Sequence, residues 1–192
     1  MKKSLFALAT LVLAAGTLHA ESATYKIDPN HTKAMFEVKH FGTSTNRGRW
    51  DKTEGEISLD KAAKTGKADI TIDMASINTG IGAFNDHLKG VEFFDVATHP
   101  TAKFVGDKFT FAADKVTEVA GNLTIRGKTH PAVLKATNFN CYENPKLKRE
   151  VCGGDFETVI KRSAFDINWG IADRAAADDI KVTIQAEAIK QQ

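Results

Sequence analysis

The sequence predicts an all-β protein whose antiparallel sheet is closed as a barrel or folded as a sandwich. Apolar and polar residues alternate along most of the chain, as they do in half-buried strands. The predicted strands follow one another without intervening helices, which favours antiparallel pairing. The alternation stops over residues 80–104, where apolar side chains have the spacing of a short helix and a turn. We expect this segment to cover one end of the β structure, or simply to close a hydrophobic core.

The first 20 residues are predicted to be a signal peptide that is removed from the mature protein. Lys2 and Lys3 precede an uncharged, mostly apolar run over residues 4–18, and the segment ends at Ala20. A positive start, an apolar run too short for a transmembrane helix and a small residue at the cut are typical of export signals. Cleavage after Ala20 would leave residues 21–192 as one domain, periplasmic or secreted.

The charge pattern argues against several classes of partner. The full chain has a formal net charge of +2, and removal of Lys2 and Lys3 makes the mature chain neutral. Lysines are dispersed rather than clustered, which disfavours nucleic acid or a membrane surface as the partner. The outward strand positions carry Lys, Asp, Glu and Thr, whereas a membrane-embedded barrel is apolar outside. We therefore expect a domain that does not span the membrane.

The strands are predicted in order from this alternation. The first covers residues 24–27 and ends at a turn cluster, residues 28–30. Residues 33–40 alternate cleanly, a polar loop is predicted over residues 42–48, and Trp50 is predicted to begin the next strand. The remaining apolar faces fall in the segments 55–60, 67–74, 102–111, 119–125, 132–136, 156–160 and 179–188.

Cys141 and Cys152 predict a disulfide. In an exported protein, an even pair of cysteines separated by a loop most simply forms a bridge. Their spacing is not Cys-x-x-Cys, so a structural role on a hairpin loop is predicted rather than redox activity.

Many small residues on the predicted inward faces suggest an interior with room for a ligand. An eight-stranded barrel is either just filled by side chains or holds one small ligand, and empty volume is costly. A long apolar ligand and a flattened sandwich with closely packed sheets both fit this pattern. The inward small residues are Ala34, Gly55, Ala68, Ala102, Gly121, Ala132, Ala136, Ala186 and Ala188.

In the barrel interpretation, large apolar side chains and a few polar ones line the cavity and its mouth. The predicted ligand-binding residues are Ala34, Phe36, Val38, His40, Trp50, Ile57, Ile70, Ile72, Phe84, Asp86, His87, Leu88, Phe93, Phe94, Phe104, Leu123, Leu134, Ala136, Trp169 and Ile184.

The polar members, His40, Asp86 and His87, are candidates to hydrogen-bond the polar head of an apolar ligand. The alternatives are that Asp86 caps the short helix and that His40 is a core histidine with its hydrogen bonds satisfied. The histidines show no local metal-ligand spacing, and no Gly-x-Ser-x-Gly nucleophile elbow is present. No catalytic residue, metal or catalytic cofactor is therefore predicted.

An ordered set of motifs along the mature chain resembles the YceI-like family. The motifs are Ile27-Asp28 with His31, Phe36-Glu37-Val38-Lys39-His40-Phe41-Gly42, Ala75-Ser76-Ile77-Asn78-Thr79-Gly80, Asp86-His87-Leu88, Phe93-Phe94-Asp95-Val96, His99-Pro100-Thr101-Ala102-Lys103-Phe104, Gly121-Asn122-Leu123-Thr124-Ile125-Arg126-Gly127 and Lys161-Arg162-Ser163-Ala164-Phe165. The cysteine loop and the segment 165–168, where a glycine often follows the aromatic residue, depart from the family pattern.

The resemblance implies an extended, lipocalin-like, eight-stranded antiparallel barrel with a short helix near one end. It also implies an exported bacterial protein, not an enzyme, that holds a polyisoprenoid such as an isoprenoid quinone (ubiquinone, for example) or a prenyl phosphate. Fatty acids or long-chain amides are the alternative ligands, and a homodimer is plausible because relatives often pair. Two rival functions are an enzyme that acts on lipid-like substrates and a lipid-free adhesin or stress protein that binds another protein.

Overall fold

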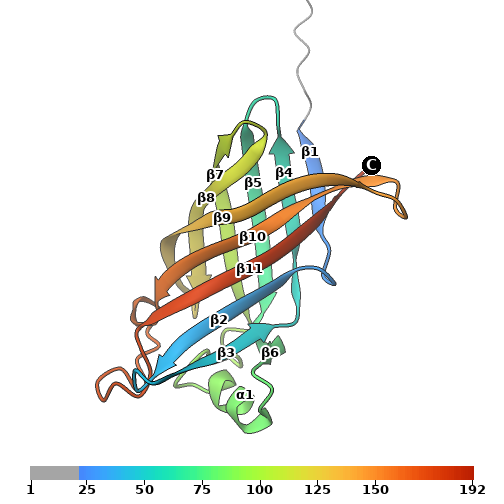
Figure 1. The fold of residues 1–192 in the computed structure, drawn as a ribbon. Coiled ribbons are helices and arrows are strands. Elements are labelled where there is room, and N and C mark those ends of the chain that lie inside the picture. The colour runs from blue at the N-terminus through green and yellow to red at the C-terminus, as the bar shows by residue number, and fades with distance from the viewer. Residues whose placement is uncertain (1–21) are drawn as a thin grey trace, which may run out of the picture.

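The computed structural model describes residues 22–192, which form an almost entirely β structure with one short α-helix (Figure 1). The predicted signal peptide lies outside the described residues. No helix within residues 22–192 is long and apolar enough to cross a membrane. In chain order the elements are β1 (Ala23–Ile27), β2 (Lys33–His40), β3 (Ser44–Trp50), β4 (Thr53–Asp60), β5 (Thr65–Asp73), the 3₁₀ turn η1 (Met74–Ser76), β6 (Ile77–Asn78), α1 (Gly82–Lys89), β7 (Thr101–Ala112), β8 (Lys115–Ile125), β9 (Lys128–Asn144), β10 (Arg149–Lys161), the 3₁₀ turn η2 (Arg162–Phe165) and β11 (Asp179–Lys190).

Eight of these strands close into an antiparallel barrel, which confirms the predicted fold. Their order around the ring is β1-β4-β5-β7-β8-β9-β10-β11, and pairing of β11 with β1 completes it. Closure leaves the ring without a free strand edge. It also creates an interior that is filled either by side chains or by a ligand. The buried hydrophobic residues form two clusters, one toward α1 around Trp50 and Phe165, the other around Tyr25 and Phe104.

One edge of β11 pairs with two different strands. Its residues 188–190 pair with β1, whereas residues 181–185 pair with β2. Between β1 and β2 the chain makes a turn in which the Asp28 carboxylate accepts hydrogen bonds from the Asn30 backbone N–H and the His31 ring, at 2.9 and 2.8 Å. From there β2, β3 and β6 extend the sheet toward α1 (Figure 1).

The predicted loop over residues 42–48 is wrong, because most of it belongs to β3. This strand pairs with β2 from Ser44 to Trp50, so Trp50 ends the strand instead of beginning the next one. On its other side β3 pairs only with the two-residue β6, and most of its side chains are partly or fully exposed. On the face of β3 that ends in the buried Trp50, the preceding half-buried positions are Asn46 and Gly48, so the strand carries no apolar alternation and its sequence resembles a polar loop.

The interruption of the strand pattern contains the expected short helix, α1. Phe84 and Leu88 are four residues apart and so lie on one face, where both pack on the buried cluster at this end of the barrel. The following turns are tied back to the helix, because the backbone N–H of Phe94 donates to the Leu88 carbonyl at 3.1 Å. The segment therefore covers the end of the barrel that we call the α1 end.

The predicted disulfide between Cys141 and Cys152 is present. The two residues are directly opposite each other in the β9–β10 ladder, close to the hairpin turn, with Cα atoms 4.1 Å apart. The bridge therefore fixes the register of the longest hairpin in the barrel.

Replacing both cysteines with alanine should lower the free energy of unfolding by about 2–3 kcal/mol, because the unfolded chain would lose a closed loop of this size. Urea denaturation monitored by tryptophan fluorescence measures the change. Reductant should have the same effect on the wild type and none on the double variant. An unchanged unfolding midpoint would show that the bridge does not stabilise the barrel.

Opposite the α1 end, a half-buried carboxylate ties three parts of the barrel together. Glu150 of β10 accepts hydrogen bonds from the Tyr25 hydroxyl of β1 and from Lys61 in the β4–β5 turn. Partial burial acts to raise the pKa of Glu150, but the hydrogen bonds from Lys61 and Tyr25 and the positive charge of Lys61 outweigh it, so the pKa is lowered. Burial and the hydrogen bond to Glu150 raise the pKa of Tyr25.

Because the pKa of Glu150 is lower in the folded state, its contribution to stability is present above its unfolded value of about 4.3 and is lost as the pH falls through the folded value. We expect Glu150→Gln to cost about 1–2 kcal/mol at pH 7 and to weaken the dependence of stability on pH below about 4.3. Urea melts at several pH values test this. Glu56→Gln, on the exposed side of β4, is the matched control. Identical pH profiles for the two variants would contradict the assignment.

Candidate ligand-binding site

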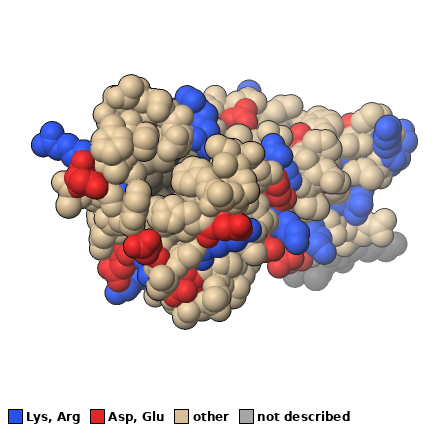
Figure 2. Space-filling view, turned by 90° about the horizontal axis from the view of Figure 1, so that it is seen from below, with Lys and Arg blue, Asp and Glu red and all other residues tan. Residues whose placement is uncertain are grey.

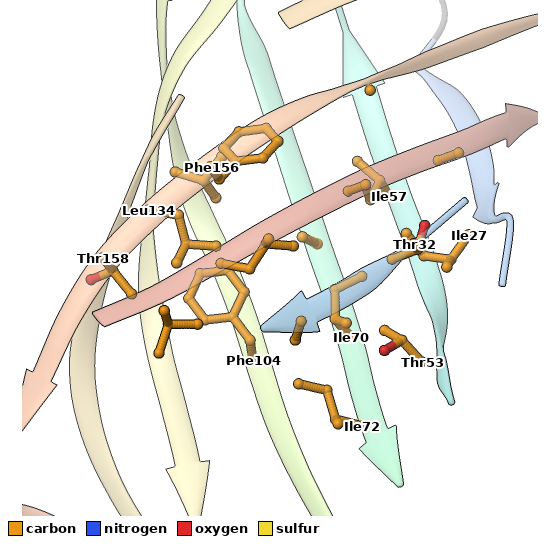
Figure 3. A pocket seen from close by; sticks show the side chains of 18 of the residues that line it. Ile27, Thr32, Thr53, Ile57, Ile70, Ile72, Phe104, Leu134, Phe156 and Thr158 are labelled. Carbon is orange, nitrogen blue, oxygen red and sulfur yellow. The ribbon is translucent and has the colours of Figure 1, made fainter. Parts of the chain in front are cut away.

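An apolar cavity of about 180 Å³, the inner chamber, lies inside the barrel. All eight barrel strands contribute to its wall, and side chains such as Ile70, Phe104 and Leu134 point into it (Figure 3). Among the labelled side chains in that view, only Thr32, Thr53 and Thr158 carry oxygen. A cavity with such walls suits hydrocarbon better than water.

A second cavity of about 180 Å³, the outer chamber, lies at the α1 end. Its wall combines β2, α1 and the loop that follows β10. The ring of His87 packs edge-on against Phe93 and Trp169, with centroids 4.7 and 5.3 Å apart. Trp169 keeps 42% of its surface exposed. Seen from below, this part of the molecule is hollowed, with mostly uncharged side chains around the hollow (Figure 2).

The two chambers adjoin at a waist of four residues that line both: Trp50, Ile125, Ile160 and Val182. These residues come from β3, β8, β10 and β11, which follow one another along one side of the sheet with β9 and β2 between them. The Trp50 ring packs against Phe36 and Phe94, at centroid distances of 5.2 and 5.6 Å. A long, thin ligand that passed the waist would occupy both chambers.

Two buried polar groups in the cavity wall have no hydrogen-bond partner within residues 22–192, the indole N–H of Trp50 and the hydroxyl of Thr53. Both residues are more than nine-tenths buried. Thr32, in the same wall, differs because its hydroxyl donates to the Glu187 carbonyl and accepts from the Glu187 N–H, both at 3.1 Å. An unpaired buried polar group costs about 1–3 kcal/mol. At Trp50 and Thr53 the described protein residues therefore leave the cost of a buried polar group uncompensated.

Arg162 places a charge beside the outer chamber. It begins η2, is 5% exposed and lines the chamber. Its guanidinium group donates hydrogen bonds only to backbone carbonyls, those of Ile167, Trp169, Ala176 and Ala177. Burial lowers the pKa of Arg162 and the negative charge of Asp178 opposes that effect, but a guanidinium remains protonated in proteins. Arg162 thus holds the loop between β10 and β11 against the α1 end.

The structure brings most of the predicted ligand-binding residues to the walls of these chambers. Lining the inner chamber are Ala34, Trp50, Ile57, Ile70, Ile72, Phe104, Leu123, Leu134 and Ile184. Lining the outer chamber are Phe36, Val38, His40, Trp50, Phe84, His87, Leu88, Phe93, Phe94 and Trp169. His40 and His87 are exposed, which places them at the rim and not in the core.

Two predicted residues, Asp86 and Ala136, line neither chamber. Asp86 lies on the solvent side of α1, away from the buried Leu88, and its carboxylate lies 3.7 Å from Lys89. It does not cap the helix, which begins after Ile81 without a side-chain cap. Ala136 packs on the buried cluster around Tyr25 and Phe104, and its short side chain stops outside the cavity.

The sequence did not single out Arg162, Thr53 or the three aliphatic residues of the waist. Ile125, Ile160 and Val182 were on predicted inward faces, but alternation does not tell how far along the barrel each one sits. Arg162 belongs to a motif that carried the family resemblance, yet nothing local indicates that an arginine after a strand is buried.

Within the described part of the chain, the one cluster of metal-type ligands is Cys141, Glu150 and Cys152. Both sulfurs are bonded to each other, and Glu150 is engaged by Tyr25 and Lys61. With the disulfide intact, the cluster offers no thiolate ligand.

Comparison with known proteins identifies the family. The profile of the YceI-like domain matches residues 25–188, almost the whole described barrel. The chain belongs to the YceI-like family. Protein YceI of Salmonella arizonae is 30% identical over 196 residues, covering 100% of both chains. The crystal structure of the Campylobacter jejuni YCEI protein has a TM-score of 0.70 at 28% identity, over 80% of this chain and 90% of that one.

The fold of this YceI-like protein also resembles that of a polyisoprenoid-binding domain from Saccharophagus degradans, implicated in plant cell wall breakdown. The TM-score is 0.61 at 16% identity, over 87% of this chain and 98% of that one. At this identity the likeness concerns the fold.

The two threonines of the inner wall provide a matched test of the cavity. In ligand-free protein, Thr53→Val should stabilise by about 1 kcal/mol because it removes an unpaired hydroxyl, whereas Thr32→Val should destabilise by about 1–2 kcal/mol because it breaks two hydrogen bonds. Urea denaturation of the two variants measures both changes. Equal destabilisation would mean that the Thr53 hydroxyl does have a partner.

Proposed function

We propose that this YceI-like protein binds a long isoprenoid lipid along the axis of its barrel. The observation that carries the proposal is the pair of apolar chambers joined at the waist, a path that a branched hydrocarbon chain would fill. Burial of the chain supplies the driving force, at about 25 cal/mol per Å² of apolar surface removed from water. The fold shared with a polyisoprenoid-binding domain supports the same ligand class.

The distribution of polar side chains gives the ligand a direction. The outer chamber contains His40, Asn46, His87 and Arg162, whereas the inner chamber is lined almost entirely by hydrocarbon. In the proposal, the isoprenoid tail lies in the inner chamber and the head group lies in the outer chamber, near α1. Ubiquinone and prenyl phosphates are candidate ligands, and fatty acids or long-chain amides are the alternative.

The predicted signal peptide supports a role in the periplasm, in lipid storage, lipid transport or a stress response. In the periplasm, a protein that encloses an isoprenoid tail would store the lipid or carry it between membranes, with no chemical step. Sequestration requires no catalytic residue and no catalytic cofactor, and a homodimer would be compatible with it.

Mass spectrometry of an organic extract from the purified mature protein tests this function. We expect a stoichiometric isoprenoid lipid. A fatty acid or amide would retain the binding function but replace the ligand class. An empty extract, together with specific capture of a protein partner, would favour an interaction module, and turnover of a lipid substrate that requires His40 or His87 would favour an enzyme.

A substitution that fills the inner chamber should displace the lipid. Ala186 lines the chamber and is only half-buried, so a phenylalanine ring at this position has space in the void. If Ala186→Phe removes about 60 Å² of apolar contact, affinity should fall about tenfold. The readout is the lipid-to-protein ratio in the extract.

Gln185→Phe is the control, because Gln185 is the neighbouring residue on β11 and is exposed. It adds the same ring outside the cavity and should leave the ratio unchanged. Equal lipid content in the two variants, with both barrels folded by circular dichroism, would mean that the inner chamber is not the binding site.

A further inference from the structure

Arg162 is a buried cation without a carboxylate partner. Within residues 22–192, no carboxylate oxygen lies within the 4.0 Å range of an ion pair with its guanidinium group. Asp178, the acidic residue whose charge it feels, is occupied elsewhere. The Asp178 carboxylate accepts hydrogen bonds from the backbone N–H and the hydroxyl of Ser163, both at 2.9 Å, and lies 3.9 Å from Lys161.

Backbone carbonyls solvate the guanidinium group but do not neutralise it. Nε donates to Ala177 at 2.8 Å, one terminal nitrogen donates to Ile167 and Trp169 at 3.1 and 2.7 Å, and the other donates to Ala176 at 2.8 Å. These bonds use four of the five N–H groups of an arginine, and the fifth has no protein partner among the described residues. A full positive charge therefore stays at the chamber wall, with one donor to spare.

The other side chains of the outer chamber do not neutralise the charge of Arg162. No Asp or Glu lines the chamber, and its other polar side chains are Asn46, His40 and His87, each able to donate a hydrogen bond. A chamber with a buried guanidinium in its wall, several donors and no carboxylate in its lining is poorly matched to a neutral hydrocarbon, because the carbonyl groups around Arg162 solvate its charge but do not neutralise it.

We infer that the outer chamber selects an isoprenoid lipid with an oxyanion head group, and that Arg162 is the residue that determines this selectivity. This inference rests on the proposed function and narrows it: an anionic head, such as a phosphate, binds more tightly than a neutral head on the same tail. The arginine is suited to the task because a guanidinium presents a planar fork of donors to phosphate or carboxylate oxygens.

Binding of farnesyl phosphate, farnesol and inorganic phosphate to delipidated protein tests the inference, with calorimetry or quenching of the fluorescence of Trp50 and Trp169 as the readout. The phosphate ester should bind about 10- to 100-fold more tightly than the alcohol, the range expected for a hydrogen bond to a charged group. Inorganic phosphate should bind far more weakly than the ester, because it has no tail to bury.

The outcomes separate the two proposals. Equal or weaker binding of farnesyl phosphate relative to farnesol would overturn the head-group selectivity and leave the isoprenoid-binding function intact. Absence of binding by both lipids would overturn the function as well. Inorganic phosphate that binds as tightly as the ester would assign the chamber to a free oxyanion and not to a lipid head.

Two arginine variants test whether the head-group selectivity depends on Arg162. Arg162→Gln should reduce the ratio of the two lipid affinities to about one. Arg126→Gln is the matched control, because Arg126 also donates to backbone carbonyls at the α1 end, those of Asp166 and Val91, yet lines neither chamber. Its ratio should match the wild type, and a ratio reduced equally in both variants would contradict the role of Arg162.

Arg162→Gln removes several hydrogen bonds from the loop, so a second readout in the wild-type protein is needed if that variant does not fold. The NMR signal of the Arg162 Nε–H group should shift on addition of farnesyl phosphate and not on addition of farnesol. Equal shifts with both lipids would show that the head group does not reach the guanidinium.

Discussion

The architecture depends on the branching of one edge of β11. The backbone of Glu187 accepts hydrogen bonds from the Asp28 N–H and the Thr32 hydroxyl, and its own N–H donates to Thr32, so this residue anchors both ends of the turn between β1 and β2. On one side of Glu187 the ring closes through β1, and on the other side the wall passes to β2 and β3. The α1 end is therefore built from different elements than the rest of the barrel, and a separate chamber is formed there.

The cavity inside the ring arises from alanines more than from glycines. A Cβ atom on Gly121 or Gly55 would lie 2.1 or 2.2 Å from a backbone carbonyl oxygen of the adjacent strand, so these glycines permit close strand contact. Ala34, Ala68 and Ala102, by contrast, face the inner chamber. The small-residue pattern thus has two physical causes, and only one of them provides room for a ligand.

Alternation was enough to predict an antiparallel β fold and its helical interruption, and the spacing of the two cysteines predicted the disulfide, because each leaves a local mark in the sequence. The choice of a closed barrel over a sandwich came from the resemblance to the YceI-like family. Alternation failed at β3, whose inner face carries Asn46 and Gly48 before the buried Trp50, and it misplaced Ala136, because facing inward does not mean reaching the cavity. The partition into two chambers and the burial of Arg162 depend on where distant strands and the loop before β11 meet. Such long-range contacts have no periodicity that one segment could reveal.

The interior cavity links ligand binding to the stability of the barrel. Apolar voids cost about 24 cal/mol per Å³ in proteins, and the wall around them also contains the unpaired groups of Trp50 and Thr53. A ligand that fills both chambers would restore the missing contacts and stabilise the folded state by mass action. Along the barrel axis, the same ligand would contact hydrocarbon in the inner chamber and polar or charged side chains in the outer chamber, since these gather at the α1 end. In the proposed function, tail burial supplies most of the affinity, and the inferred contact of the head group with Arg162 discriminates between lipids that share the same tail.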